Sequence, residues 1–154
     1  MTPDPKISTP FAPLETGRRF AGRLVRDADL SAAINALCRR IGLRAAAFSA
    51  RGTVNSATVG VFDPFQQVYV THHDDRAMEI AACRGTWDDG EAPWNLYGQI
   101  LLAAADGALT GGRLFSETRV HEGEVELLEL LEPAPRRRYD SDTGVAMWSF
   151  DTPF

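Results

Sequence analysis

Residues 29–42 read DLSAAINALCRRIG, and this stretch sets the kind of fold that the rest of the chain has to complete. Its apolar residues recur at the three- and four-residue spacing of a helix buried along one side, namely Leu30, Ala33, Ile34, Leu37, Cys38 and Ile41. Asp27 or Asp29 can cap the start of this helix, and Gly42 stands where a helix ends in a left-handed residue. The pattern predicts one amphipathic helix, with Asn35 away from its apolar side.

Short strand patterns surround this helix, with turn residues between them. They lie at residues 18–26, 43–50, 53–62, 67–72, 77–83, 97–105, 114–120 and 124–131. Arg51-Gly52, Asp63-Pro64 and Asp106-Gly107 would interrupt the chain, and Glu122-Gly123 has the chemistry of a hairpin turn. Residues 84–93 are polar and predict a loop. One helix among many short strands predicts an α/β (α+β) fold, in which a mixed, mostly antiparallel sheet carries one main helix.

The strand pattern at 124–131 changes phase. Val125 and Leu127 are apolar at odd positions, and Leu128 and Leu130 are apolar at even ones. A β-bulge would produce this shift, and so would a strand that is covered on both faces. Both interpretations remain open at the level of sequence.

Length, charge and cysteine content narrow the class of protein. A chain of 154 residues has the size of one domain, and its net charge of −5 disfavours contact with nucleic acid unless basic residues gather on one face. Cys38 and Cys83 lie in apolar stretches and are expected to be buried thiols. No apolar run is as long as a membrane span, so we expect a cytoplasmic protein without a membrane partner.

Three parts are expected along the chain. Residues 1–14 are rich in proline and predict an extended N-terminal arm, which lacks the apolar core of a signal peptide. Residues 15–133 would form the domain, and Pro133 and Pro135 would end its sheet. Residues 134–154 form a C-terminal extension, which is first basic and then aromatic.

The most specific local signal is Thr110-Gly111-Gly112-Arg113-Leu114 downstream of Asp106-Gly107. Other matching pieces are Asp29-Leu30, Gly52, residues 59–63 (VGVFD), Met78-Glu79-Ile80, Gly85, Val125-Glu126-Leu127, Tyr139-Asp140 and Thr143-Gly144. In this order and spacing, from residue 19 to residue 148, the chain resembles the plants-and-prokaryotes-conserved (PPC) domain family.

The resemblance implies a sheet-and-helix domain that assembles with itself as a homotrimer, and it implies no established reaction. Plant members of the family contact DNA through a separate AT-hook. This chain has no Arg-Gly-Arg-Pro sequence, and Gly17-Arg18-Arg19 is a poor substitute. We therefore expect the bacterial stand-alone type of PPC domain, for which a nucleic-acid partner is not expected.

Many bacterial members of the family carry three metal-binding histidines, two of them in a His-x-His pair on one strand. By ungapped alignment from Asp106-Gly107, the corresponding positions here are Tyr97, Gln99 and Arg113. None of these is a good zinc ligand, so no metal and no cofactor is expected. Either the site has decayed into ordinary polar surface, or Arg113 replaces the metal's charge and binds an anion together with Tyr97 and Gln99. In the second interpretation, Gly111 and Gly112 would let a ligand approach the backbone closely.

Several other polar residues are further candidates for a site. Glu79 stands among small residues and would need a partner, for which Arg51 or Arg113 is the natural candidate. The run His72-His73-Asp74-Asp75 contains ligand types, but adjacent strand residues point to opposite faces. Arg136, Arg137 and Arg138 form a basic run that predicts a solvated face or a contact to another subunit.

These observations favour a homotrimeric, non-enzymatic binding or regulatory domain with a degenerate metal site that takes up a small anionic ligand. An enzyme acting on a small anionic metabolite is the first alternative, with Glu79 as the available base. A DNA-associated regulator is the second. No catalytic residue is identified.

Overall fold

The computed structural model describes residues 11–150. The predictions for the first ten residues of the N-terminal arm and for the last four residues of the C-terminal extension lie outside the described residues.

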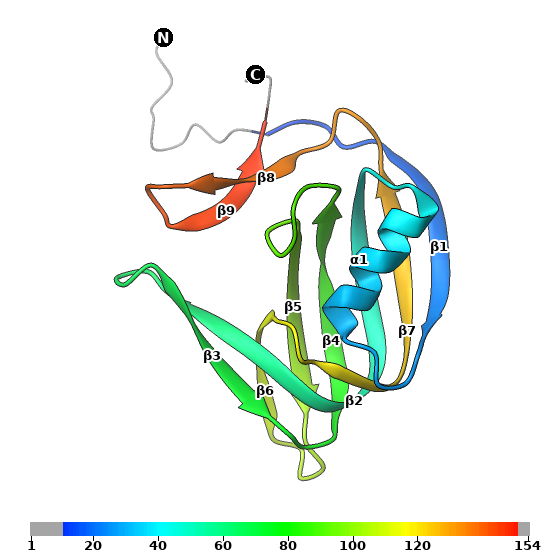
Figure 1. The fold of residues 1–154 in the computed structure, drawn as a ribbon, viewed down its shortest axis with the longest axis vertical. Helices are drawn as coiled ribbons and strands as arrows, with labels where there is room; N and C mark the ends of the chain where they lie inside the picture. The colour runs from blue at the N-terminus through cyan, green and yellow to red at the C-terminus, as the bar shows by residue number, and fades with distance from the viewer. Residues whose placement is uncertain (1–10, 151–154) are drawn as a thin grey trace.

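The domain is built on one antiparallel sheet with a single helix packed on it (Figure 1). The helix is α1 (Leu30–Ile41), and the strands are β1 (Thr16–Leu24), β2 (Ala45–Asp63), β3 (Val68–Asp74), β4 (Met78–Asp88), β5 (Leu96–Ala103), β6 (Leu109–Leu114), β7 (Arg119–Leu130), β8 (Arg136–Asp140) and β9 (Val145–Ser149). The first seven strands form the sheet in the order β1-β7-β2-β4-β5-β6, with β3 paired to β2. The predicted mostly antiparallel sheet with one main helix is confirmed.

The long strand β2 organises this sheet. Its first part pairs with β7 and β4, and its last part forms a ribbon with β3 that projects from the body of the domain (Figure 1). Val59 and Gly60 of β2 also pair with Leu114 and Arg113 of β6. The strands β2, β4, β5 and β6 are therefore joined in a closed ring of pairings, which fixes the position of Arg113.

The helix has the predicted boundaries. The Asp29 side chain caps it by accepting a hydrogen bond from the Ala32 N–H at 3.0 Å, and Gly42 ends it at φ 80°. Leu30, Ile34 and Cys38 are fully buried against the sheet. Asn35 lies away from the apolar stripe but is half-buried, and its Oδ1 accepts hydrogen bonds from Trp87 Nε1 at 2.9 Å and from Asn95 Nδ2 at 3.1 Å.

Two glycines that predicted chain breaks lie inside strands instead. Gly52 is within β2 and Gly123 is within β7, and the two residues are paired opposite each other. A Cβ on Gly52 would lie 2.6 Å from Gly123 Cα, so the glycines allow the two strands to approach closely. The predicted break at Arg51-Gly52 and the predicted hairpin at Glu122-Gly123 are therefore wrong.

Other strand limits also differ from the predictions. β4 continues to Asp88, so the first half of the predicted loop at 84–93 is strand, and the predicted strand at 114–120 is split between the end of β6 and the start of β7. At Leu127 and Leu128 the register of β7 runs without a shift against both β1 and β2, so there is no bulge. Leu127 packs in the core on the helix side of β7. Leu130 points to the opposite face and is also buried, which favours the alternative of a strand covered on both faces.

The C-terminal extension forms a hairpin of β8 and β9, which was not predicted. Its turn meets the turn of the β2–β3 ribbon, where Gln67 Nε2 donates to the Asp142 carbonyl at 3.5 Å. Over residues 11–150 the structure contains no helix that is long and apolar enough to cross a bilayer.

Candidate anion-binding site

Three neighbouring strands place polar side chains in one row on the sheet face opposite the helix. Arg84 of β4 pairs with Gln99 of β5, and Gln99 pairs with Arg113 of β6. Residues that are opposite each other in an antiparallel pair point to the same face. Tyr97 lies two residues before Gln99 and therefore shares that face.

Aromatic rings surround the guanidinium of Arg113. Its Cζ lies 4.8 Å from the ring centroid of Tyr69, 4.9 Å from that of Tyr97 and 5.7 Å from that of Phe115. The residue is only 9% exposed, and its Nη2 donates to the Leu96 carbonyl at 3.3 Å. A cation–π contact to a desolvated cation stabilises it by about 2 kcal/mol.

The buried charge of Arg113 has no carboxylate partner within residues 11–150. Buried charges in proteins are normally paired with an opposite charge, so this arrangement is unusual. The other guanidinium nitrogens of Arg113 form no hydrogen bond with residues 11–150, and they are not completely shielded from solvent.

A hollow of about 530 Å³ opens at this place. Five of the predicted ligand-binding residues line it: Tyr97, Gln99, Gly111, Gly112 and Arg113. Tyr69 and Arg84 line it as well and were not identified from the sequence. Arg84 could have been found only from its pairing with Gln99 across β4 and β5. The sequence does not give that pairing, because it depends on where β4 begins and ends.

Gly111 and Gly112 also have a structural role, which was not expected. A Cβ on Gly111 would lie 2.5 Å from the Ile100 carbonyl oxygen of β5, and one on Gly112 would lie 2.5 Å from the Gly60 carbonyl oxygen of β2. The glycines therefore make room for the backbones of neighbouring strands. This close approach holds β6 and Arg113 in place.

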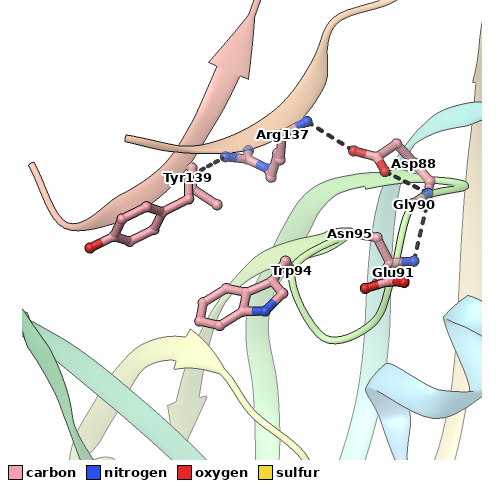
Figure 2. Close-up of a pocket in the computed structure, with 8 residues that line it drawn as sticks. Asp88, Gly90, Glu91, Trp94, Asn95, Arg137 and Tyr139 are labelled. Atoms are coloured by element: carbon pink, nitrogen blue, oxygen red, sulfur yellow. Dashed lines mark hydrogen bonds between the residues drawn. The ribbon is translucent and has the colours of Figure 1, made fainter. Parts of the chain in front are cut away.

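A second arginine, Arg137 of the tail hairpin, approaches the same tyrosine. Its Cζ lies 4.5 Å from the Tyr97 ring centroid. Figure 2 shows Arg137 beside the end of β4 and the loop that follows it. The backbone N–H of Arg137 donates to Asp88 Oδ2 at 3.1 Å. The side chain also donates to the Ala146 carbonyl at 3.2 Å and to Thr86 Oγ1 at 3.1 Å.

Arg137 sits in an unfavourable setting for a cation. Its Nε is buried without a hydrogen-bond partner among the described residues. Burial lowers the pKa of Arg137, and the nearby charge of Arg113 lowers this pKa further. Two guanidiniums that repel each other beside one ring create a positive potential that an anion would relieve.

Glu79 and Arg51 lie away from this site. Ala81 is an extra residue in β4 against β5, and this bulge brings Cys83 onto the core face of Met78 and Ile80, while Glu79 lies exposed on the other face. Arg51 pairs with Glu124 at 3.0 Å. The expected pairing of Glu79 with Arg51 or Arg113 is therefore wrong.

The cysteines and histidines form no reactive cluster. Burial raises the pKa values of Cys38 and Cys83 to about 12, so both thiols stay protonated at neutral pH, as expected of buried structural thiols. His73 lies between Thr58 Oγ1 at 2.7 Å and Asp75 Oδ1 at 2.9 Å, in an exposed arrangement at the end of β3.

Comparison with known proteins agrees with the fold. The model of the Plants and Prokaryotes Conserved (PCC) domain, also abbreviated PPC, matches residues 12–131. This chain belongs to the PPC domain family. Among curated protein sequences, none matches it.

Solved structures resemble this PPC domain over most of its length. A metal-containing protein from Archaeoglobus fulgidus is 33% identical, with a TM-score of 0.82 over 90% of this chain and 97% of that one. A PPC protein from Pyrococcus horikoshii is 22% identical, with a TM-score of 0.83 over 92% and 98%. A protein from Bacteroides thetaiotaomicron that is proposed to bind DNA is 20% identical, with a TM-score of 0.78 over 90% and 99%.

The residues of this PPC domain do not fit the metal site that its family resemblance implies. The ungapped alignment of the sequence analysis would put its three positions at Tyr97, Gln99 and Arg113, and the fixed positive charge of Arg113 would repel a metal cation. In the part of the chain that the structure describes, no group of three or more His, Cys, Asp or Glu side chains could hold a metal ion. A guanidinium surrounded by rings suits an anion instead.

Proposed function

We propose that this PPC domain is a non-enzymatic binding domain that takes up a small carboxylate or phosphate at Arg113. The observation that carries the proposal is the buried guanidinium of Arg113, which faces a hollow of about 530 Å³ and has no carboxylate partner among residues 11–150. A charge-assisted hydrogen bond to an anion is about twice as strong as a neutral one.

The residues around Arg113 would have separate roles in binding. Gln99 and the Tyr97 hydroxyl offer hydrogen bonds along the same sheet face, and Arg84 adds a second, exposed charge at the rim. Arg137 adds positive potential from the tail hairpin. Among the described residues, none that lines the hollow is a Ser, Thr, Cys, His, Asp, Glu or Lys, which favours binding over turnover there.

The basic run of the tail supports a small ligand rather than nucleic acid. Arg136 is paired with Asp89 and with Glu132, and Arg137 is half-buried against Tyr97. Arg138 alone of the three is left as an exposed cation without a described contact in residues 11–150. In a chain with net charge −5, a basic run that leaves one free cation in the described part of the chain would neutralise few phosphates.

We expect anion binding to raise the melting temperature of the protein. Acetate, succinate and inorganic phosphate would be titrated against the purified full chain, with chloride at equal ionic strength as the reference. Saturation at a hundred times Kd stabilises a protein by about 2.7 kcal/mol. The Arg113→Ala variant should lose this stabilisation, because the anion loses its main charged partner.

The matched control for this experiment is Arg138→Ala, which removes an exposed charge from the tail and should leave the ligand response intact. A flat response to all three anions in the wild-type protein, with Arg113→Ala merely less stable, would mean that Arg113 serves only the packing of its aromatic neighbours. Equal responses in wild type and Arg113→Ala would place the anion elsewhere.

We also propose that the domain works as a homotrimer, as its family resemblance implies. Exposed apolar side chains near the hollow support this proposal, since Val61 and Leu101 line it and are 55% and 39% exposed. Light scattering coupled to size exclusion should give three times the chain mass of 16.9 kDa at micromolar concentration. A monomer mass would contradict the proposal and would leave the anion site to be completed within one chain.

A further inference from the structure

A larger cleft of about 850 Å³ lies on another side of Arg113. It is bounded by the start of α1, the β2–β3 ribbon, the loop before β5, the end of β6 and the β8–β9 hairpin. The contact between Gln67 and Asp142 joins the two hairpin turns next to it, and Figure 1 shows these turns close together. Its size falls in the range of small-molecule sites.

One wall of the cleft is a row of aromatic rings. The Phe62 and Tyr69 centroids are 5.2 Å apart, and the Tyr69 and Phe115 centroids are 5.4 Å apart in an edge-to-face arrangement. All three side chains line the cleft. Such a row offers ring faces and edges to a flat apolar molecule.

Trp94 adds a further ring from the loop before β5. Trp94 is 55% exposed. It lines both this cleft and a third, separate pocket, which Figure 2 shows. The loop that carries it is fixed, because Asn95 donates to the Asp88 carbonyl at 3.0 Å and to Asn35 Oδ1 at 3.1 Å. A large aromatic side chain held open in this way is available for stacking.

Arg113 lines the cleft as well as the smaller hollow of about 530 Å³. It therefore brings a positive charge, nine-tenths buried and without a carboxylate partner among residues 11–150, to a cavity whose other walls are aromatic and aliphatic side chains together with polar ones that include Asp29, Glu117 and Arg119. The molecule that complements these walls has a planar aromatic body and one negative charge at its end.

We propose that this cleft is a second binding site, which takes a planar aromatic carboxylate with its ring system against Trp94 and the Phe62–Tyr69–Phe115 row and its carboxylate at Arg113. The inference rests on the proposed function in one respect, because it uses the same arginine as an anion receptor. It differs in the cavity, in the aromatic residues and in the class of ligand.

The test is isothermal titration of the full chain with 2-naphthoate, with its neutral counterpart 2-naphthalenemethanol, and with acetate. We expect 2-naphthoate to bind at least tenfold more tightly than either of the others. Trp94→Ala should weaken 2-naphthoate about tenfold, which corresponds to the loss of one aromatic contact. The same variant should leave acetate and phosphate unchanged.

Two further variants separate the cleft from the hollow. Gln99→Leu should weaken acetate and phosphate but not 2-naphthoate, since Gln99 lines only the hollow. Phe65→Ala is the matched control for Trp94→Ala, because Phe65 is a 97% exposed aromatic residue outside the cleft. Circular dichroism melts would show that each variant is folded.

The outcomes distinguish the two proposals. If acetate or phosphate binds but 2-naphthoate gains nothing from its ring, the cleft proposal is wrong and the proposed function stands. The same holds if 2-naphthoate is lost in Gln99→Leu and kept in Trp94→Ala, because the ring then lies in the hollow. If no anion binds at all, both proposals are wrong.

Discussion

Replacing Trp87 with alanine is expected to lower the free energy of unfolding by about 3–5 kcal/mol. Trp87 is 2% exposed and fills the space between β4 and α1. Its Nε1 donates to Asn35 Oδ1, which also accepts from Asn95. The substitution would leave a cavity and remove one of the two donors that hold Asn35.

Urea denaturation followed by circular dichroism measures this effect. Trp94→Ala serves as the control, because Trp94 is 55% exposed and its removal should cost less than about 1 kcal/mol. A loss for Trp87→Ala as small as that for Trp94→Ala would mean that the helix is not anchored to the sheet through this ring.

Replacing Gly112 with alanine is expected to destabilise the domain by about 1–3 kcal/mol and to weaken anion binding at the same time. The new Cβ would meet the Gly60 carbonyl oxygen at 2.5 Å and the Gly60 carbonyl carbon at 3.2 Å. These are backbone atoms and cannot rotate away. Relief requires β6 to move from β2, and Arg113 moves with it because it is the next residue on β6.

The control for this substitution is Gly22→Ala in β1. A Cβ there would lie 3.5 Å from Val125 Cγ1, which is ordinary contact, so alanine should be neutral or stabilising by about 0.5–1 kcal/mol. The measurements are urea denaturation and titration with the anion that stabilises the wild-type protein. Equal stability of the two variants would show that the β2–β6 pairing can relax without cost.

The elements that were correctly predicted depend on local signals. The helix at 29–42 has its apolar spacing, its cap and its final glycine within one continuous stretch, and each of these can be read without knowing what the helix packs against. The predominance of antiparallel pairing followed from many short strands with brief connections.

The errors came from residues whose role is set by a distant strand. Gly52 and Gly123 carry the local signature of turns, but they are 71 positions apart and face each other across β2 and β7. The bulge at Ala81 has no local signature, and it puts Cys83 on the face opposite to Glu79. Neither fact can be derived before the strand pairing is known.

The site divides in the same way. Tyr97, Gln99 and Arg113 could be placed together because the family resemblance supplied their alignment. Arg137 could not, because its approach to Tyr97 depends on how the tail hairpin folds back over the sheet. A basic run of three residues carries no information on which of its members turns inward.

The central place of β7 also constrains how the protein is made. β7 pairs with β1 on one side and with β2 on the other. Neither β1 nor β2 can complete these pairings until β7, which ends at Leu130, has been synthesised. At the usual pace of translation, roughly five to twenty seconds separate the synthesis of β1 from that of β7. During this interval the edge of β2 that later receives β7 has no native neighbour on the nascent chain, and an open strand edge is a template for aggregation. Because β7 is the last strand of the main sheet to be synthesised, this edge of β2 is also the last to gain its neighbour.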